Sequence, residues 1–379
     1  MDIGLCRKHQ FSVGVAMPGA VDWKTAEAVA TRIAQRDELS NSYLYRSLAP
    51  DFEELTAQAQ ILVESHTGWT SESGLARARV VDRKDWIRAN IASFQRMLKP
   101  LTDRLESNLV FGPANIIGSR IAGAELGFVL GWMSTRVLGQ YDLLVLEDDN
   151  PEDQDLVYYV GPNILALEKR FSFAPREFRL WIALHEVTHR TQFTAKPWLR
   201  TYFLEQVSTM MSLADPDPAR LFAAIGRVAE ALRTRTNPLD DGGVVTLFAS
   251  AEQRASMNRI GGLMSLLEGH GDITMDRAGG DEIPSADRFG AVLRGRRTEQ
   301  SAPAKLLQKL IGMEAKMNQY EQGERFIEAV EQRAGAAVLE RAFHGPNELP
   351  TLVEIRDPDA WIRRVGGDSR PALGATLSV

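Results

Sequence analysis

The sequence predicts a mainly α-helical protein with one small β-hairpin. Most of its 379 residues fall into segments whose apolar side chains recur every three or four positions, the spacing of one helix face. Such helices are expected at residues 22–35, 51–66, 84–98, 119–138, 199–213, 218–233, 304–317 and 321–334. Two short β-favouring segments, 141–147 and 156–160, flank an acidic turn and predict the hairpin. The fold class is therefore mainly α with a small hairpin or sheet.

Another helix is expected from Pro175 to about residue 195. Proline suits a first helical turn, an apolar run follows it, and Lys196-Pro197 ends the pattern. This helix carries His185-Glu186-Val187-Thr188-His189. Histidines four residues apart lie on one helical face, so both imidazoles can point at one metal ion, with Glu186 beside it. The pattern predicts two metal ligands and a carboxylate that can act as a base.

Chance and core packing are the competing explanations for this pattern. A chain with 6 histidines matches it by chance on the order of once in a hundred such sequences. A single histidine on an apolar face is usually a hydrogen-bonded core residue. Two histidines with this spacing, and a glutamate after the first, favour a metal site.

The third ligand is expected at Glu268. Glu268 and Asp272 are four residues apart, so on a helix one can bind metal while the other accepts a hydrogen bond from a ligand histidine. His270 and Glu205 are the alternatives, and Glu205 lies closer to His189 in the sequence. The metzincin pattern is excluded, because it requires glycine and histidine where this chain has Gln192 and Ala195.

An ordered series of motifs is spread over most of the chain, from about residue 19 to 365. Its members are Trp86, Asn90-Ile91, Phe94, 127–131, 138–142, Gly161-Pro162-Asn163, 178–181, 185–189, Phe193, Pro197-Trp198-Leu199, 267–270, Lys316, Gln319-Tyr320, Gly323 and Phe326. This series resembles the bacterial zincin-like metallopeptidases, a largely uncharacterised family of zinc-dependent metalloproteases. The resemblance implies a zincin-like, mostly helical fold that binds zinc. Some members are also labelled as associated with deazaflavin-coenzyme biosynthesis, although no glycine-rich nucleotide-binding motif is present here.

The predicted chemistry is hydrolysis of a peptide or amide bond. With zinc held by His185, His189 and Glu268, one position stays open for water, and Glu186 is expected to be the general base. Tyr320, His270 and His344 are candidates for a donor to the developing oxyanion, Tyr320 first among them. The alternative is a catalytically silent, zinc-stabilised binding or regulatory protein.

Composition limits the remaining possibilities. A net charge of −6 argues against an electrostatic nucleic-acid partner, so a peptide or small amide is the expected substrate. Cys6 is the single cysteine, which leaves histidine and carboxylate as zinc ligands. No secretory signal is recognised, and the apolar run 122–133 is interrupted by Glu125 and judged too short for a membrane. A cytoplasmic protein is expected, and the oligomeric state is left open.

Two organisational features are also expected. Residues 1–105 are expected to form an N-terminal helical region packed on a catalytic region, 106–379, with the two making one integrated unit. Breaks are expected at 71–74, 237–243 and 278–303, the last a loop that holds Arg294, Arg296 and Arg297.

Overall fold

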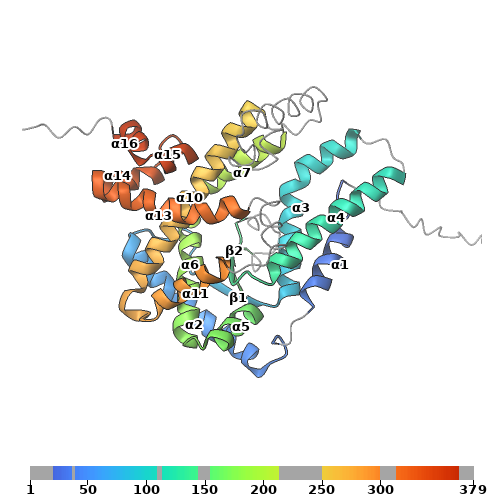
Figure 1. Cartoon of the computed structure of the whole chain (residues 1–379), viewed down its shortest axis with the longest axis horizontal. Coiled ribbons are helices and arrows are strands. Elements are labelled where there is room, and N and C mark those ends of the chain that lie inside the picture. Colours follow the sequence, from blue (N-terminus) through green and yellow to red (C-terminus); the bar gives the residue numbers. More distant parts are fainter. Residues whose placement is uncertain are drawn as a thin grey trace, which may run out of the picture.

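The computed structural model describes residues 20–35, 39–108, 113–143, 154–212, 250–298 and 313–366 (Figure 1). Within these residues the chain is mostly helical. The helices are α1 (Trp23–Ala34), α2 (Tyr43–Thr67), α3 (Arg83–Asn108), α4 (Pro113–Ser134), α5 (Gly161–Phe171), α6 (Pro175–Ala195), α7 (Trp198–Ser212), α10 (Ala251–Gly279), α11 (Ala286–Thr298), α13 (Met313–Ala334), α14 (Ala336–Glu340), α15 (Leu352–Arg356) and α16 (Pro358–Gly366). Short 3₁₀ turns, η2 (Gly280–Glu282) and η3 (Arg341–Phe343), follow α10 and α14. The mainly α fold class is confirmed.

The predicted helices at 22–35, 51–66, 84–98, 119–138, 199–213 and 321–334 correspond to α1, α2, α3, α4, α7 and α13. The helix predicted at 218–233, the break at 237–243 and most of the helix at 304–317 lie outside the described residues. The break at 71–74 is confirmed, since those residues separate α2 from the first strand. Periodicity therefore located the long helices, and their ends differ by a few residues.

One small sheet has three strands, β1 (Arg77–Val81), β2 (Gly139–Tyr141) and β3 (Leu156–Val160), in the order β1-β3-β2. The pair β2 and β3 is antiparallel, as the hairpin prediction required, but β2 shares only Tyr141 with the predicted strand at 141–147, of which residues 144–147 lie outside the described residues. The strand β1 was not predicted. It pairs parallel with β3, with Arg77 opposite Leu156, and its mixed arginine and apolar sequence gives no local strand signal. Because β3 is central, all five of its residues are buried.

The long loop predicted at 278–303 is wrong over most of its length. Helix α10 extends to Gly279, η2 follows, and α11 occupies residues 286–298 together with the three arginines. The cause is Phe289, which is fully buried and meets Phe173 and Phe178 edge-on, at ring-centroid distances of 4.8 and 5.2 Å. This long-range aromatic contact supports a helix that its own polar sequence does not indicate.

Helix α6 and the sheet lie in the middle of the molecule. Figure 1 shows α1, α3 and α4 together on one side and α13 to α16 on the other. Helix α6 contacts α2, α10 and β2, so its apolar face is covered by elements from both halves of the sequence. The pairing of β1 with β3 likewise joins residues on both sides of the boundary predicted at 105, and that boundary stays a prediction.

Helix α4 contains the stretch Asn115–Ser134, which is long and apolar enough to cross a membrane by length and composition. The stretch is thus longer than the apolar run considered in the sequence. Its glycines at 123, 127 and 131 face α1, where an added Cβ would clash with the backbone of that helix. Close helix packing accounts for these small residues. The predicted cytoplasmic location stays a prediction.

Candidate metal centre

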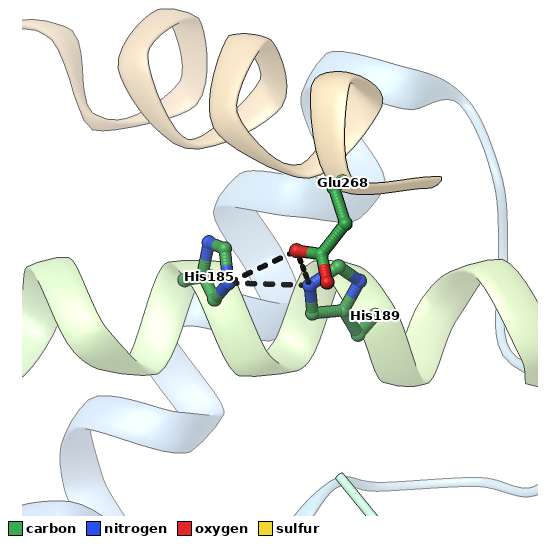
Figure 2. Close-up of side chains that lie close together, drawn as sticks. All are labelled: His185, His189 and Glu268. Atoms are coloured by element: carbon green, nitrogen blue, oxygen red, sulfur yellow. Dashed lines mark hydrogen bonds and ion pairs between the residues drawn. The ribbon is translucent and has the colours of Figure 1, made fainter. Parts of the chain in front are cut away.

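Helix α6 brings His185 and His189 to one face, and α10 brings Glu268 opposite them (Figure 2). The helix begins at Pro175, with Glu177 in the first turn, and its apolar residues bury it before the first histidine is reached. The histidines are partly buried, and Glu268 is 5% exposed. The residues predicted from the four-residue spacing therefore meet in space.

The distances between the donor atoms suit a zinc ion. The two Nε2 atoms of His185 and His189 are 3.2 Å apart, and Glu268 Oε2 lies 3.4 Å from His189 Nε2 and 4.0 Å from His185 Nε2. Donors at zinc-ligand distances in a tetrahedron lie about 3.3 Å from one another. Two imidazoles and one carboxylate are also a usual zinc donor set. Within the described residues, these three side chains are the one group that could hold a metal ion.

Asp272 lies one helical turn after Glu268 and faces His185. Its Oδ1 is 3.4 Å from His185 Nδ1, on the side of the ring opposite the donor nitrogen. Burial lowers the pKa of His185, but the hydrogen bond to Asp272 and the charges of Glu186 and Glu268 outweigh it and raise the pKa to about 9. The carboxylates thus create a negative potential that favours a cation at this place.

Glu186 lies in a narrow space between α6 and β2. It is 8% exposed, and the backbone N–H of Tyr141 donates a hydrogen bond to its carboxylate. A Cβ added to Gly139 would lie 2.5 Å from Glu186 Cγ and 2.7 Å from its Oε1, so only glycine fits here without displacement. Burial raises the pKa of Glu186, and the neighbouring histidines partly offset this effect. A raised pKa suits a carboxylate that takes up a proton near neutral pH.

The predicted alternatives occupy other positions. His270 stacks on Trp69, with ring centroids 4.9 Å apart, and burial lowers its pKa to about 3. Glu205 is exposed on α7, outside the group of potential metal donors. His344 is exposed and lies 3.6 Å from Glu348. Tyr320 belongs to α13, but its side chain is outside the described residues.

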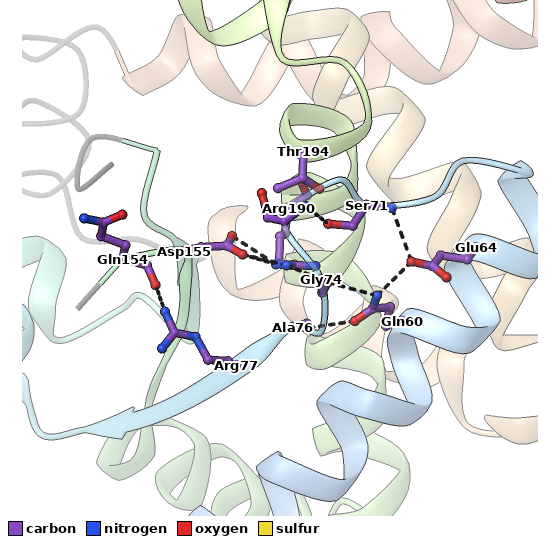
Figure 3. Close-up of polar contacts among 11 residues, drawn as sticks. Gln60, Glu64, Ser71, Gly74, Ala76, Arg77, Gln154, Asp155, Arg190 and Thr194 are labelled. Carbon is purple, nitrogen blue, oxygen red and sulfur yellow. Dashed lines mark hydrogen bonds and ion pairs between the residues drawn. The ribbon is translucent and has the colours of Figure 1, made fainter. Parts of the chain in front are cut away.

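Four contacts around this site were not predicted from the sequence. Gln192, fully buried, contacts His189 through its amide. Arg190 forms an ion pair with Asp155, next to β3, and donates to the carbonyl of Gly74 (Figure 3). Tyr141 joins this pair through a hydrogen bond to Asp155. The arginine directly after His189 therefore ties α6 to the sheet that supports Glu186.

Helix α10 is itself placed by a glycine contact. Gly269, beside Glu268, lies so close to Gly323 of α13 that a Cβ on either residue would enter the backbone of the other helix. Close approach of this kind requires glycine on both sides. The position of Glu268 therefore depends on the contact between α10 and α13.

These features define a helical protein in which two partly buried histidines and a buried glutamate form a group suited to a metal, beside the edge of a small sheet. The chain belongs to the zincin-like metallopeptidases, since the model of that family matches residues 21–362. It is also similar to a solved protein from Chloroflexus aurantiacus whose description assigns it, provisionally, to the hydrolases, with a novel fold. The two share 29% identity over 93% of this chain and 100% of the other, with a TM-score of 0.67. No curated protein matches the chain.

Proposed function

We propose that the protein is a zinc-dependent hydrolase that cleaves peptide or amide bonds. The observation that carries the proposal is the convergence of His185, His189 and Glu268 at distances suited to one tetrahedral ion. Three protein donors are the usual number at a catalytic zinc, whereas a structural zinc usually has four. When bound, zinc would supply Lewis acidity to a water molecule and to the substrate carbonyl.

The side chains of the chain have separate tasks in this proposal. His185 and His189 bind through Nε2, and Asp272 holds the His185 ring by accepting a hydrogen bond at Nδ1. Glu186 takes a proton from the attacking water and delivers it to the leaving amine. Its burial between α6 and β2 keeps the carboxylate in one place and out of bulk water.

Strand β2 offers a place for an extended substrate. Among the described strands it is one of the two outer ones, and its pairing with β3 uses the Leu138 carbonyl and the Asp142 N–H, at 2.8 and 3.2 Å. Along a strand of an antiparallel pair, the backbone N–H and C=O groups of alternate residues face the partner strand. Leu138 and Asp142 face β3, so the backbone groups of Gly139 and Tyr141 face away from it. An extended peptide that pairs with this edge at Gly139 would pass beside Glu186, whose carboxylate accepts the Tyr141 N–H.

The first test is hydrolysis of a peptide library by the zinc-loaded protein and by the variant Glu186→Gln. The variant is expected to retain zinc and lose roughly 10²- to 10⁴-fold in rate, as for loss of a general base. Glu177→Gln, a matched change in the first turn of α6, is expected to keep the rate. An undiminished rate in Glu186→Gln would remove that residue from the mechanism. A wild type that binds zinc without cleaving any peptide would favour the silent binding protein.

The second test concerns the third donor. Glu268→Ala is expected to lower the zinc content sharply, measured by elemental analysis after dialysis. Unchanged zinc content would place the third donor elsewhere, with His270 and Glu205 as the alternatives to substitute next.

A further inference from the structure

The amide of Gln192 lies between His189 and His270, and no part of it reaches solvent. Its Oε1 is 3.0 Å from His189 Nδ1, and its Nε2 is 2.9 Å from the carbonyl oxygen of Leu267 and 3.1 Å from His270 Nδ1. Three hydrogen bonds thus join one residue of α6 to the ligand histidine on its own helix and to two residues of α10.

The Leu267 carbonyl fixes the direction of these bonds. A carbonyl oxygen can only accept, so the amide nitrogen of Gln192 must face Leu267 and its oxygen must face His189. His189 Nδ1 therefore carries the hydrogen, and its Nε2 presents a lone pair toward His185 and Glu268. By the same reasoning His270 Nδ1 accepts the second amide hydrogen of Gln192.

The ring of His270 is held in place by aromatic side chains. Trp69 stacks on it at 4.9 Å with an interplanar angle of 5°, and Phe343 meets it edge-on at 5.1 Å. Thr274 Oγ1 lies 3.4 Å from the same Nδ1. His270 is thus a fixed acceptor that faces Gln192, on the same helix as Glu268.

We propose that Gln192 and His270 are positioning residues that set the ring orientation and tautomer of His189 for metal binding. His270 acts through Gln192 and does not bind the metal. This inference rests on the metal site of the proposed function. It also makes the two ligand histidines unequal, because His185 faces the charged Asp272 while His189 faces a neutral amide, which increases imidazole basicity less.

The test is a double-mutant cycle on zinc affinity, measured by chelator competition with the full chain. Gln192→Met removes the hydrogen bonds at nearly constant volume and is expected to weaken zinc binding roughly 10- to 100-fold. His270→Phe keeps an aromatic ring but removes the acceptor, so a smaller loss is expected. If His270 acts through Gln192, the double variant binds zinc as Gln192→Met does.

Gln58→Met is the matched control, since it makes the same substitution on α2, where the side chain bonds Glu282 and Arg176 and neither histidine, and its zinc affinity is expected to match wild type. Histidine ¹⁵N NMR of the metal-free protein is a second readout, with His189 as the Nδ1–H tautomer in wild type and a mixture in Gln192→Met. If Gln192→Met leaves both the zinc affinity and the His189 tautomer unchanged, the inference is overturned while the proposed function stands. A full additional loss from His270→Phe in the double variant would also overturn it, as for a direct ligand. A wild type that binds no zinc would overturn both the inference and the proposed function.

Discussion

Replacing Gly139 by alanine tests whether β2 fixes the position of Glu186. The added Cβ would lie 2.5 Å from Glu186 Cγ and 2.7 Å from Oε1, whereas ordinary contacts begin at 3.4 Å. Glu186 or the strand must therefore move by about 1 Å, a displacement that costs an enzyme about 100-fold in rate. The corresponding loss of transition-state stabilisation is about 3 kcal/mol.

The assay compares the peptide-cleavage rate and the zinc content of Gly139→Ala with those of wild type. The rate is expected to fall about 100-fold while zinc stays bound, because the clash falls on Glu186 and not on a donor. Gly118→Ala is the control, since a Cβ added there meets nothing within 4 Å, and its rate is expected to be unchanged. A Gly139→Ala variant with the wild-type rate would refute the reasoning that contact with β2 positions the base.

Two further predictions concern stability. Asp155→Asn should lower the free energy of unfolding in urea by about 3–5 kcal/mol, because it leaves the fully buried Arg190 guanidinium without its counter-charge. Glu331→Gln, in a more exposed pair with Arg277, should cost under about 1 kcal/mol, and equal losses would contradict this ranking. Burial alone would raise the pKa of Glu354, but hydrogen bonds from Arg364 and Thr351 outweigh it and lower the pKa below its usual 4.5. Its stabilising effect is therefore complete above pH 4.5 and is lost as the pH falls through the lowered pKa, so Glu354→Gln should destabilise the protein at pH 7 and progressively less in acid. A stability difference that does not change with pH would contradict the second prediction.

The sequence predicted the parts of the site that follow from helical spacing. His185 and His189 share a face because they are four residues apart, and the same rule places Glu268 and Asp272 together. The tautomer of His189 could not be predicted, because it depends on the Leu267 carbonyl of another helix. The need for glycine at position 139 could not be predicted either, because it arises from a contact between β2 and α6.

The same distinction between local and distant contacts explains which parts of the fold could be predicted from the sequence. Long amphipathic helices were recognised because their periodicity is contained in their own sequence. Strand β1 exists through its pairing with β3, which is distant in the sequence, and α11 through the packing of Phe289 on α6. The sequence of β1 does not indicate its pairing with β3, and the sequence of α11 does not indicate its packing on α6.

The glycine contact between α10 and α13 controls the position of Glu268 from outside the group of potential metal donors. Gly323 touches the backbone of α10 at Ser265 and Gly269, yet it lies outside the group of potential donors. Any larger residue there would push α10, and with it Glu268, to a new distance from the histidines. Substitution at this position could therefore retune the site during evolution while every donor residue stayed the same.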